Sequence, residues 1–184
     1  PTRRSSDLPT TALDVTIQAD ILQLLEELKA TYGMGVLFVT HDLATVSEIA
    51  DRVVVLYAGK VMERGGVLEL FEHPAHPYTR RLLACLPGWS GGVDPVEGAE
   101  RGGIAGSLPD PNDPPDGCRF APRCAYAEPA CTTGDQPPEV DLGGDHLVSC
   151  IHYDAGDDPS VLTDGTPPSD GVDGSPQRGV TEDD

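Results

Sequence analysis

A short apolar run places the strongest constraint on how this chain can fold. Residues 35–41, GVLFVTH, are rich in branched side chains and do not alternate with polar residues. Such a run is typical of a parallel strand that is buried on both faces. Amphipathic helices are predicted on either side of it, over residues 16–29 and 42–50, because apolar residues recur there at helical spacing. A helix, a buried strand and a helix in succession indicate an α/β sheet.

The residues that follow continue the pattern. Two more strands are predicted over 51–65, around a turn at Ala58 and Gly59, and short helices over 67–72 and 78–86. Two or three strands with their helices amount to about half of a doubly wound domain. We therefore interpret this part as the carboxyl-terminal half of a larger α/β domain. Cys85, inside the last apolar helix, is expected to be a small core residue.

Charge is distributed unevenly along the chain. Of the net charge of −19, residues 9–87 contribute −4 and residues 88–184 contribute −16. The excess of acid argues against nucleic acid as a partner, because phosphate binding needs clustered Lys and Arg. Residues 88–117 are dominated by Gly, Pro and Asp and are interpreted as a linker. Residues 154–184 are acidic with few large apolar groups and are predicted to be disordered.

Two His-Pro pairs, His73-Pro74 and His76-Pro77, precede the last predicted helix. Proline prevents a regular helix from aligning the two histidines as metal ligands. We interpret the pairs as the point at which the chain leaves the core.

Four stretches of the sequence resemble one known family, in that family's order. PTTALDVTIQADIL and GMGVLFVTHDLATVSEIADRVVVLYAGKVMERG are similar to the ATP-binding subunits of ABC transporters. HPAHPYTRRLLACLPG and the later cysteine motif resemble the C-terminal extension of the dipeptide/oligopeptide importer branch. Together they cover most of residues 9–153. The resemblance implies the C-terminal half of a P-loop, RecA-like ABC ATPase domain, followed by a cysteine-containing, loop-rich extension and a disordered acidic tail.

The resemblance also implies a division of the chain. Pro1–Leu8 lacks the apolar strand that precedes PTTALD in the family, so we interpret it as a foreign segment and expect the natural sequence to begin near Pro9. The expected parts are the ATPase portion (9–66), the helical importer extension (67–87), the linker (88–117), the four-cysteine extension (118–153) and the tail (154–184).

Two residues of the ATPase portion match functional positions of the family. His41 ends the apolar run and resembles the switch histidine, which helps to position the water that attacks ATP; an imidazole at the carboxyl end of a strand is suited to this. Asp14, in TALD, resembles the D-loop aspartate at the interface between two ATPase subunits. From position alone, His41 could equally be a structural histidine and Asp14 a helix cap.

Four cysteines lie in the extension, separated by 5, 6 and 18 residues: Cys118, Cys124, Cys131 and Cys150. Four sulfurs in a segment without its own core suggest a covalent or metal staple. Zinc sites usually contain a C-x2-C pair, which is missing, and a cytosolic location disfavours disulfides. A [4Fe–4S] cluster accepts irregular spacing and is also what related importer subunits suggest. Zn²⁺ and free thiols or disulfides remain as alternatives.

The parent protein implied by the resemblance is an ATPase that uses ATP and Mg²⁺ to energise uptake of di- or oligopeptides. The sequence contains no G-x-x-x-x-G-K-[ST] loop, no ABC signature and no Walker B acids, so this chain itself is expected to be inactive. The implied partners are a second ABC ATPase subunit, identical or different, two membrane permease subunits and, indirectly, an extracytoplasmic solute-binding protein. The expected location is peripheral, on the cytoplasmic face of the membrane. Alternatives are an importer for nickel or another small solute, a soluble ABC ATPase without a transport role, and a free-standing metal-binding module.

Overall fold

The computed structural model describes residues 15–86, 89, 104, 106–154 and 162, with only the backbone for residues 15–19. The chain divides into two compact units, Pro1–Ile49 and Ala50–Asp184. Within the described residues no helix is long and apolar enough to cross a membrane. The expectations for Pro1–Leu8 and for Asp14 lie outside these residues.

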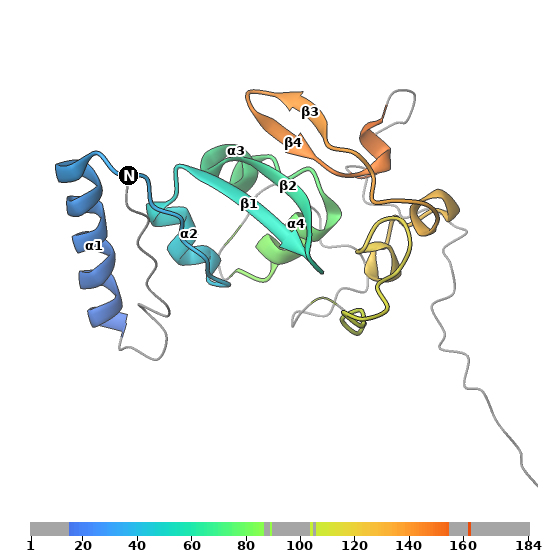
Figure 1. The fold of residues 1–184 in the computed structure, drawn as a ribbon, viewed down its shortest axis with the longest axis horizontal. Coiled ribbons are helices and arrows are strands. Elements are labelled where there is room, and N and C mark those ends of the chain that lie inside the picture. The colour runs from blue at the N-terminus through green and yellow to red at the C-terminus, as the bar shows by residue number, and fades with distance from the viewer. Residues whose placement is uncertain (1–14, 87–88, 90–103, 105, 155–161, 163–184) are drawn as a thin grey trace, which may run out of the picture. The chain divides into compact units, whose positions relative to one another are not determined.

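The described part of the first unit consists of two helices, α1 (Val15–Tyr32) and α2 (Leu43–Ile49) (Figure 1). Both confirm helices that the sequence predicts. Asp42 caps α2: its carboxylate accepts hydrogen bonds from the Ala44 N–H at 3.0 Å and from the Thr45 hydroxyl at 2.6 Å. The hydrogen bond from Thr45 is the main cause that lowers the pKa of Asp42.

The strand expected over residues 35–41 is wrong. Within the described residues, 34–40 have no regular secondary structure and pair with no strand. The side chains of Leu37 and Val39 are 86% and 89% exposed. A strand is stable only when a neighbour satisfies its N–H and C=O groups, and no described segment does this here. The run is therefore apolar, as a buried strand would be, but it lies in no sheet within the described residues.

The second unit is built around an antiparallel sheet of four strands in the order β1-β2-β4-β3 (Figure 1). β1 (Arg52–Tyr57) and β2 (Lys60–Gly66) form the predicted hairpin, with positive φ at Ala58 and Gly59. β3 (Val140–Gly143) and β4 (His146–Val148) form a second hairpin, which the sequence analysis did not predict. The mixture of helix and strand is confirmed, whereas the expected parallel sheet is wrong for the described residues.

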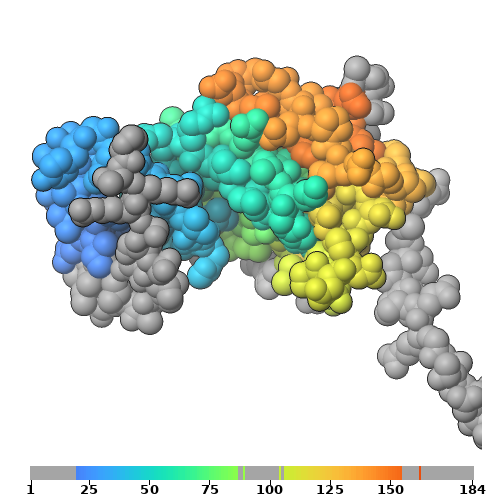
Figure 2. Space-filling view, in the orientation of Figure 1, coloured from blue at the N-terminus to red at the C-terminus, as the bar shows by residue number. Residues whose placement is uncertain are grey.

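The two hairpins join through β2 and β4. Glu63 lies opposite Val148, and Arg64 lies opposite Leu147. Figure 2 shows the two hairpins side by side on one face of this unit. The cysteine-bearing part of the chain therefore extends the sheet that begins at β1. An ion pair also joins these two parts of the chain: the Arg64 guanidinium binds the carboxylate of Glu139, 75 positions away in sequence, at 2.7 and 2.8 Å.

A β-bulge in the first hairpin brings two neighbouring side chains of β2 into the interior. Val55 pairs with Glu63 and Leu56 pairs with Val61, so Met62 has no partner in β1. Successive residues of a regular strand point to opposite faces, but a bulge breaks this alternation. Met62 and Glu63 are both fully buried.

Two short helices follow the sheet, α3 (Val67–Glu72) and α4 (Pro77–Ala84), and both contact β2. Pro77 occupies the first turn of α4, where its missing N–H is harmless, and His76 is the N-cap. The expectation that Cys85 belongs to the core is wrong. Cys85 follows the last residue of α4 and is exposed, because the buried face of this helix is formed by residues up to Leu83.

Two apolar clusters form the core of the second unit. One contains Tyr57 and Met62 from the first hairpin together with Cys118, Phe120 and Cys131 from the extension. The other contains Ala75, Tyr126, Val148, Cys150 and Leu162.

Leu162 corrects the expectation for the acidic tail at one position. Its side chain is 1% exposed, and its carbonyl oxygen accepts a hydrogen bond from the Arg80 guanidinium. An apolar side chain offsets the entropy of ordering where the fold offers it a partly formed core. The remaining residues beyond Asp154 lie outside the described part of the chain.

Candidate metal centre

Three 3₁₀ turns position three of the four cysteines. Cys124 ends the turn η1 (Ala121–Arg123), and Cys131 lies within η2 (Pro129–Thr132). Cys150 follows β4 and is the N-cap of η3 (Ile151–Tyr153). Proline within the first turn of both η1 and η2 favours these tight turns, because its φ is fixed in the helical range.

Two backbone hydrogen bonds hold the beginning of the cysteine segment against its middle. The Gly117 N–H donates to the Gly134 carbonyl at 2.7 Å, and the Cys118 N–H donates to the Cys131 carbonyl at 2.8 Å. Gly117 has φ +65°, and a Cβ at this position would collide with the Cys131 carbonyl oxygen. Only glycine fits both the conformation and the close approach.

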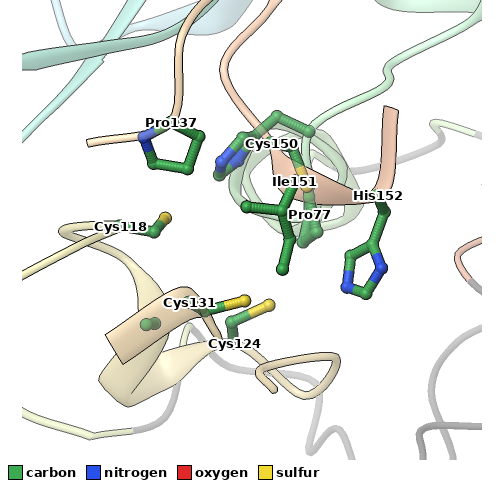
Figure 3. A pocket seen from close by; sticks show the side chains of 10 residues that line it. Pro77, Cys118, Cys124, Cys131, Pro137, Cys150, Ile151 and His152 are labelled. Atoms are coloured by element: carbon green, nitrogen blue, oxygen red, sulfur yellow. The ribbon is translucent and has the colours of Figure 1, made fainter. Parts of the chain in front are cut away.

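The four cysteines surround one small cavity, as predicted from the sequence. Figure 3 shows Cys118, Cys124, Cys131 and Cys150 around this space, with Pro137 and Ile151 in its wall. All four have free thiols. Phe120 and Tyr126 are 1% and 4% exposed and belong to the two core clusters beside the cavity.

Burial makes these thiols weak acids. It raises the pKa of Cys118, Cys124 and Cys131 above the ordinary value and that of Cys150 to about 12. In Cys124 and Cys150 the neighbouring cysteines add to the effect of burial, because four thiolates close together repel one another. A cation that replaced the four protons would remove this repulsion. Within the described residues, no group of three or more His, Cys, Asp or Glu side chains is arranged so that it could hold a metal ion.

His76 also lines the cavity and was not selected from the sequence as part of a site. It is 1% exposed, and burial lowers its pKa to about 4, so the ring is neutral at neutral pH. Its Nδ1 accepts a hydrogen bond from the Tyr78 N–H at 3.0 Å. The ring proton must therefore lie on Nε2, which is buried and has no hydrogen-bond partner among the residues that the structure describes. His73, the other histidine of the two His-Pro pairs, is exposed.

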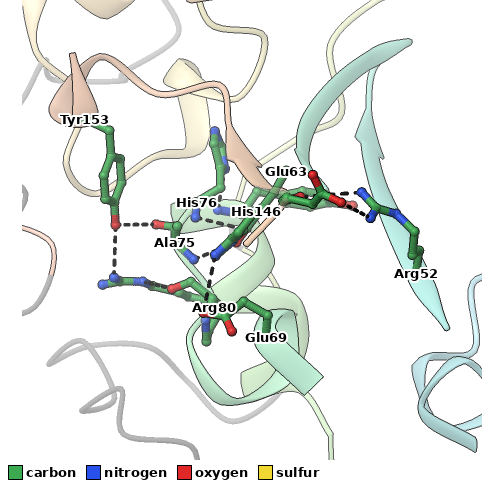
Figure 4. Close-up of polar contacts among 11 residues, drawn as sticks. Arg52, Glu63, Glu69, Ala75, His76, Arg80, His146 and Tyr153 are labelled. Atoms are coloured by element: carbon green, nitrogen blue, oxygen red, sulfur yellow. Dashed lines mark hydrogen bonds and ion pairs between the residues drawn. The ribbon is translucent and has the colours of Figure 1, made fainter. Parts of the chain in front are cut away.

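The loop that carries His76 is fixed by the buried carboxylate of Glu63 (Figure 4). This carboxylate accepts hydrogen bonds from the Ala75 N–H at 2.7 Å and from the His76 N–H at 2.9 Å. It also contacts His146 Nε2 at 2.7 Å, and this contact raises the pKa of His146. On the other side of the loop, Arg80 Nε donates to the Pro74 carbonyl at 2.8 Å. A carboxylate with several donors tolerates full burial.

The sequence analysis missed Glu63 because, in a regular strand, a charged residue next to the apolar Met62 is predicted to face solvent. The bulge and the second hairpin, which supplies His146, are what bury it. His41, the other described residue with a predicted role, is exposed and lies between the unpaired run and α2 in the first unit. The interpretation of both His-Pro pairs as an exit from the core does not hold for His76, which is interior.

The sequence matches known proteins over most of its length. Residues 62–131 match the family described as "Oligopeptide/dipeptide transporter, C-terminal region". A protein of Brucella ovis that is provisionally named a peptide import ATP-binding protein is 46% identical over 154 residues, which are 83% of this chain and 45% of that protein. The oligopeptide transport ATP-binding protein AppD of Bacillus subtilis is 45% identical over 149 residues, which are 81% of this chain and 44% of AppD.

The chain thus spans about half the length of the curated relatives that it matches. The matched region includes the helices α3 and α4, the His-Pro loop and three of the four cysteines. These similarities confirm the resemblance that the sequence motifs carry. Over the matched residues the chain is similar to the C-terminal region of oligopeptide/dipeptide transporters and to peptide import ATP-binding proteins.

Proposed function

We propose that the protein acts in an ATP-binding subunit that energises the import of di- or oligopeptides, and that its four cysteines hold a [4Fe–4S] cluster. The names of the relatives support the first part, since they refer to peptide import and oligopeptide transport. The convergence of Cys118, Cys124, Cys131 and Cys150 on one cavity supports the second.

In the whole subunit, ATP and Mg²⁺ would bind at the phosphate loop, which is not in this sequence. His41 would serve as the switch histidine and Asp14 as the D-loop residue that contacts the second ATPase subunit. Two permease subunits would carry the peptide across the membrane, and the ATPase would lie peripherally on the cytoplasmic face. These assignments rest on the family and on the motifs THD and TALD.

The four cysteine thiols in the lining are ligands of the kind that bind either a [4Fe–4S] cluster or a zinc ion. A four-iron cluster is larger than one zinc ion, so its ligand sulfurs stand further apart than those of a tetrahedral zinc site. The proposal rests on the four thiols that lie around a common space. The unpartnered Nε2–H of His76 in the lining is a donor that suits sulfur carrying negative charge. When bound, the cluster would staple a loop-rich segment and could take up one electron.

Metal analysis of the purified full-length chain tests the cluster. Protein that is reconstituted anaerobically with iron and sulfide is expected to be brown and to contain about four iron and about four sulfide ions per chain. Cys118→Ser and Cys150→Ser should each lose this iron, whereas Cys85→Ser is the matched control, because Cys85 is exposed and away from the cavity. Stoichiometric zinc without iron would establish the zinc alternative, and full iron content in both variants would overturn the shared site.

Cargo is tested in the cell that produces the protein. Disruption of the gene is expected to abolish uptake of labelled di- and oligopeptides and to leave nickel uptake unchanged. Loss of nickel uptake with normal peptide uptake would overturn the proposed cargo while leaving the cluster experiment unaffected.

A further inference from the structure

We propose that His76 donates a hydrogen bond from Nε2 to a sulfur of the proposed cluster and thereby raises the reduction potential of that cluster. This inference rests on the proposed function. The starting observation is a buried donor that has no partner within the described part of the chain. The His76 side chain is 1% exposed, its Nε2 makes no hydrogen bond there, and it lines the same cavity as the four cysteines.

The protonation of the ring identifies His76 as a donor and excludes it as a fifth ligand. The Tyr78 N–H occupies Nδ1 at 3.0 Å, which leaves the proton on Nε2. A metal ligand would need the lone pair of Nε2, whereas a hydrogen bond to sulfur needs the proton that is already there. An unsatisfied buried N–H destabilises the fold, and a sulfur acceptor in the cavity would remove this cost.

The other histidine in the lining is already engaged. His152 Nε2 lies 2.9 Å from the Tyr126 carbonyl oxygen. His76 is therefore the histidine of this cavity whose ring proton is left for a cluster sulfur.

The ring of His76 is held in place before any metal binds. Glu63 fixes the backbone N–H of Ala75 and of His76, and Pro77 locks the backbone that follows. The imidazole lies 6.0 Å from the Phe120 ring, centroid to centroid, at an interplanar angle of 58°. A donor held this firmly loses little entropy when it forms the hydrogen bond, so its electrostatic effect is available in both redox states.

The expected consequence follows from charge. Reduction adds one electron to the cluster and increases the negative charge on its sulfurs, so a donated N–H stabilises the reduced form more than the oxidised form. A differential stabilisation by one hydrogen bond to a charged acceptor corresponds to roughly a tenfold change in the reduction equilibrium, or about 59 mV for a one-electron couple.

The test compares the reconstituted full-length chain with His76→Leu, and with His73→Leu as the matched control from the other His-Pro pair. Spectroelectrochemical titration is expected to show a midpoint potential that is more negative by about 59 mV in His76→Leu, which corresponds to a tenfold change in the reduction equilibrium, and no shift in His73→Leu. Equal potentials in all three proteins would overturn the inference.

A second measurement needs no variant and guards against misfolding of His76→Leu. After exchange into D₂O, pulsed electron–nuclear double resonance of the reduced wild-type cluster should detect an exchangeable deuteron coupled to it, and selective ¹⁵N labelling of histidine should show a coupled ring nitrogen that is not a ligand. Absence of the nitrogen coupling would overturn the inference. A wild-type chain that binds no cluster would overturn the proposed function as well, so the two failures are distinguishable.

Discussion

Replacement of Glu63 by glutamine is expected to destabilise the second unit more than any other single removal of a carboxylate from the sheet. Glu63 is fully buried, and each of its carboxylate oxygens accepts a backbone hydrogen bond within 3.0 Å. Glutamine has the same shape but presents one oxygen and one NH₂ group. If its oxygen serves Ala75 and His146, its NH₂ faces the His76 N–H, donor to donor.

The size of the effect can be worked out from these contacts. The variant loses one hydrogen bond to a charged acceptor, worth about 1.5–3 kcal/mol, and the two that remain are weakened because the acceptor is neutral. Loss of one partner from a buried charged group typically costs about 3–5 kcal/mol, and we expect the variant to fall in this range. Because a domain of this kind is stable by about 5–15 kcal/mol, this loss would remove between about a fifth and all of its free energy of unfolding.

Urea unfolding followed by tryptophan fluorescence measures this directly. Trp89 is the only tryptophan, and its indole N–H donates to the Phe71 carbonyl at 3.1 Å, so its emission reports on this unit. Glu139→Gln is the control, because Glu139 lies in the same sheet region but pairs with Arg64 at the surface. Surface ion pairs contribute little, so the midpoint should barely change. Equal midpoints for the two variants, at matched iron content, would refute the reasoning.

Three further predictions concern other parts of the chain. Gly117→Ala should lower the thermal midpoint and the retained iron, because alanine is strained at φ +65° and meets the Cys131 carbonyl; a wild-type midpoint would contradict this. The pKa of His146 is raised from its ordinary 6.5 chiefly by Glu63, so its stabilisation should be complete below about pH 6.5 and disappear as pH rises through the folded-state pKa. The urea midpoint of the wild-type chain should therefore fall between about pH 6 and 9, and this dependence on pH should be weaker in His146→Gln. The same dependence on pH in both proteins would count against the pair. Calorimetry should detect no magnesium-dependent binding of ATP to this chain, which lacks the phosphate loop, and in a longer chain that has the loop His41→Ala should slow hydrolysis while leaving binding largely intact.

The first half of the chain shows how far periodicity can predict structure. The helices α1 and α2 and the hairpin β1–β2 follow from residues close together in sequence, and each was predicted. The run over 35–41 failed because a strand also needs a neighbour, and composition cannot say whether one is present. The second hairpin was missed because β3 and β4 have only four and three residues and lie among turn-forming residues.

The cysteines of the candidate site were predictable from the sequence, but their surroundings were not. Cysteine type and spacing were enough to select Cys118, Cys124, Cys131 and Cys150 and to predict that they lie together. The positions of His76 and Glu63 were not predictable, since nothing local distinguishes a buried histidine or glutamate from an exposed one. Tertiary structure decides both: the pairing of β2 with β4 brings His146 to Glu63, and Glu63 then fixes the loop that holds His76 beside the cysteines. Sequence specifies the chemical groups and the local turns, whereas the burial that gives these groups their properties depends on contacts between residues some 80 positions apart.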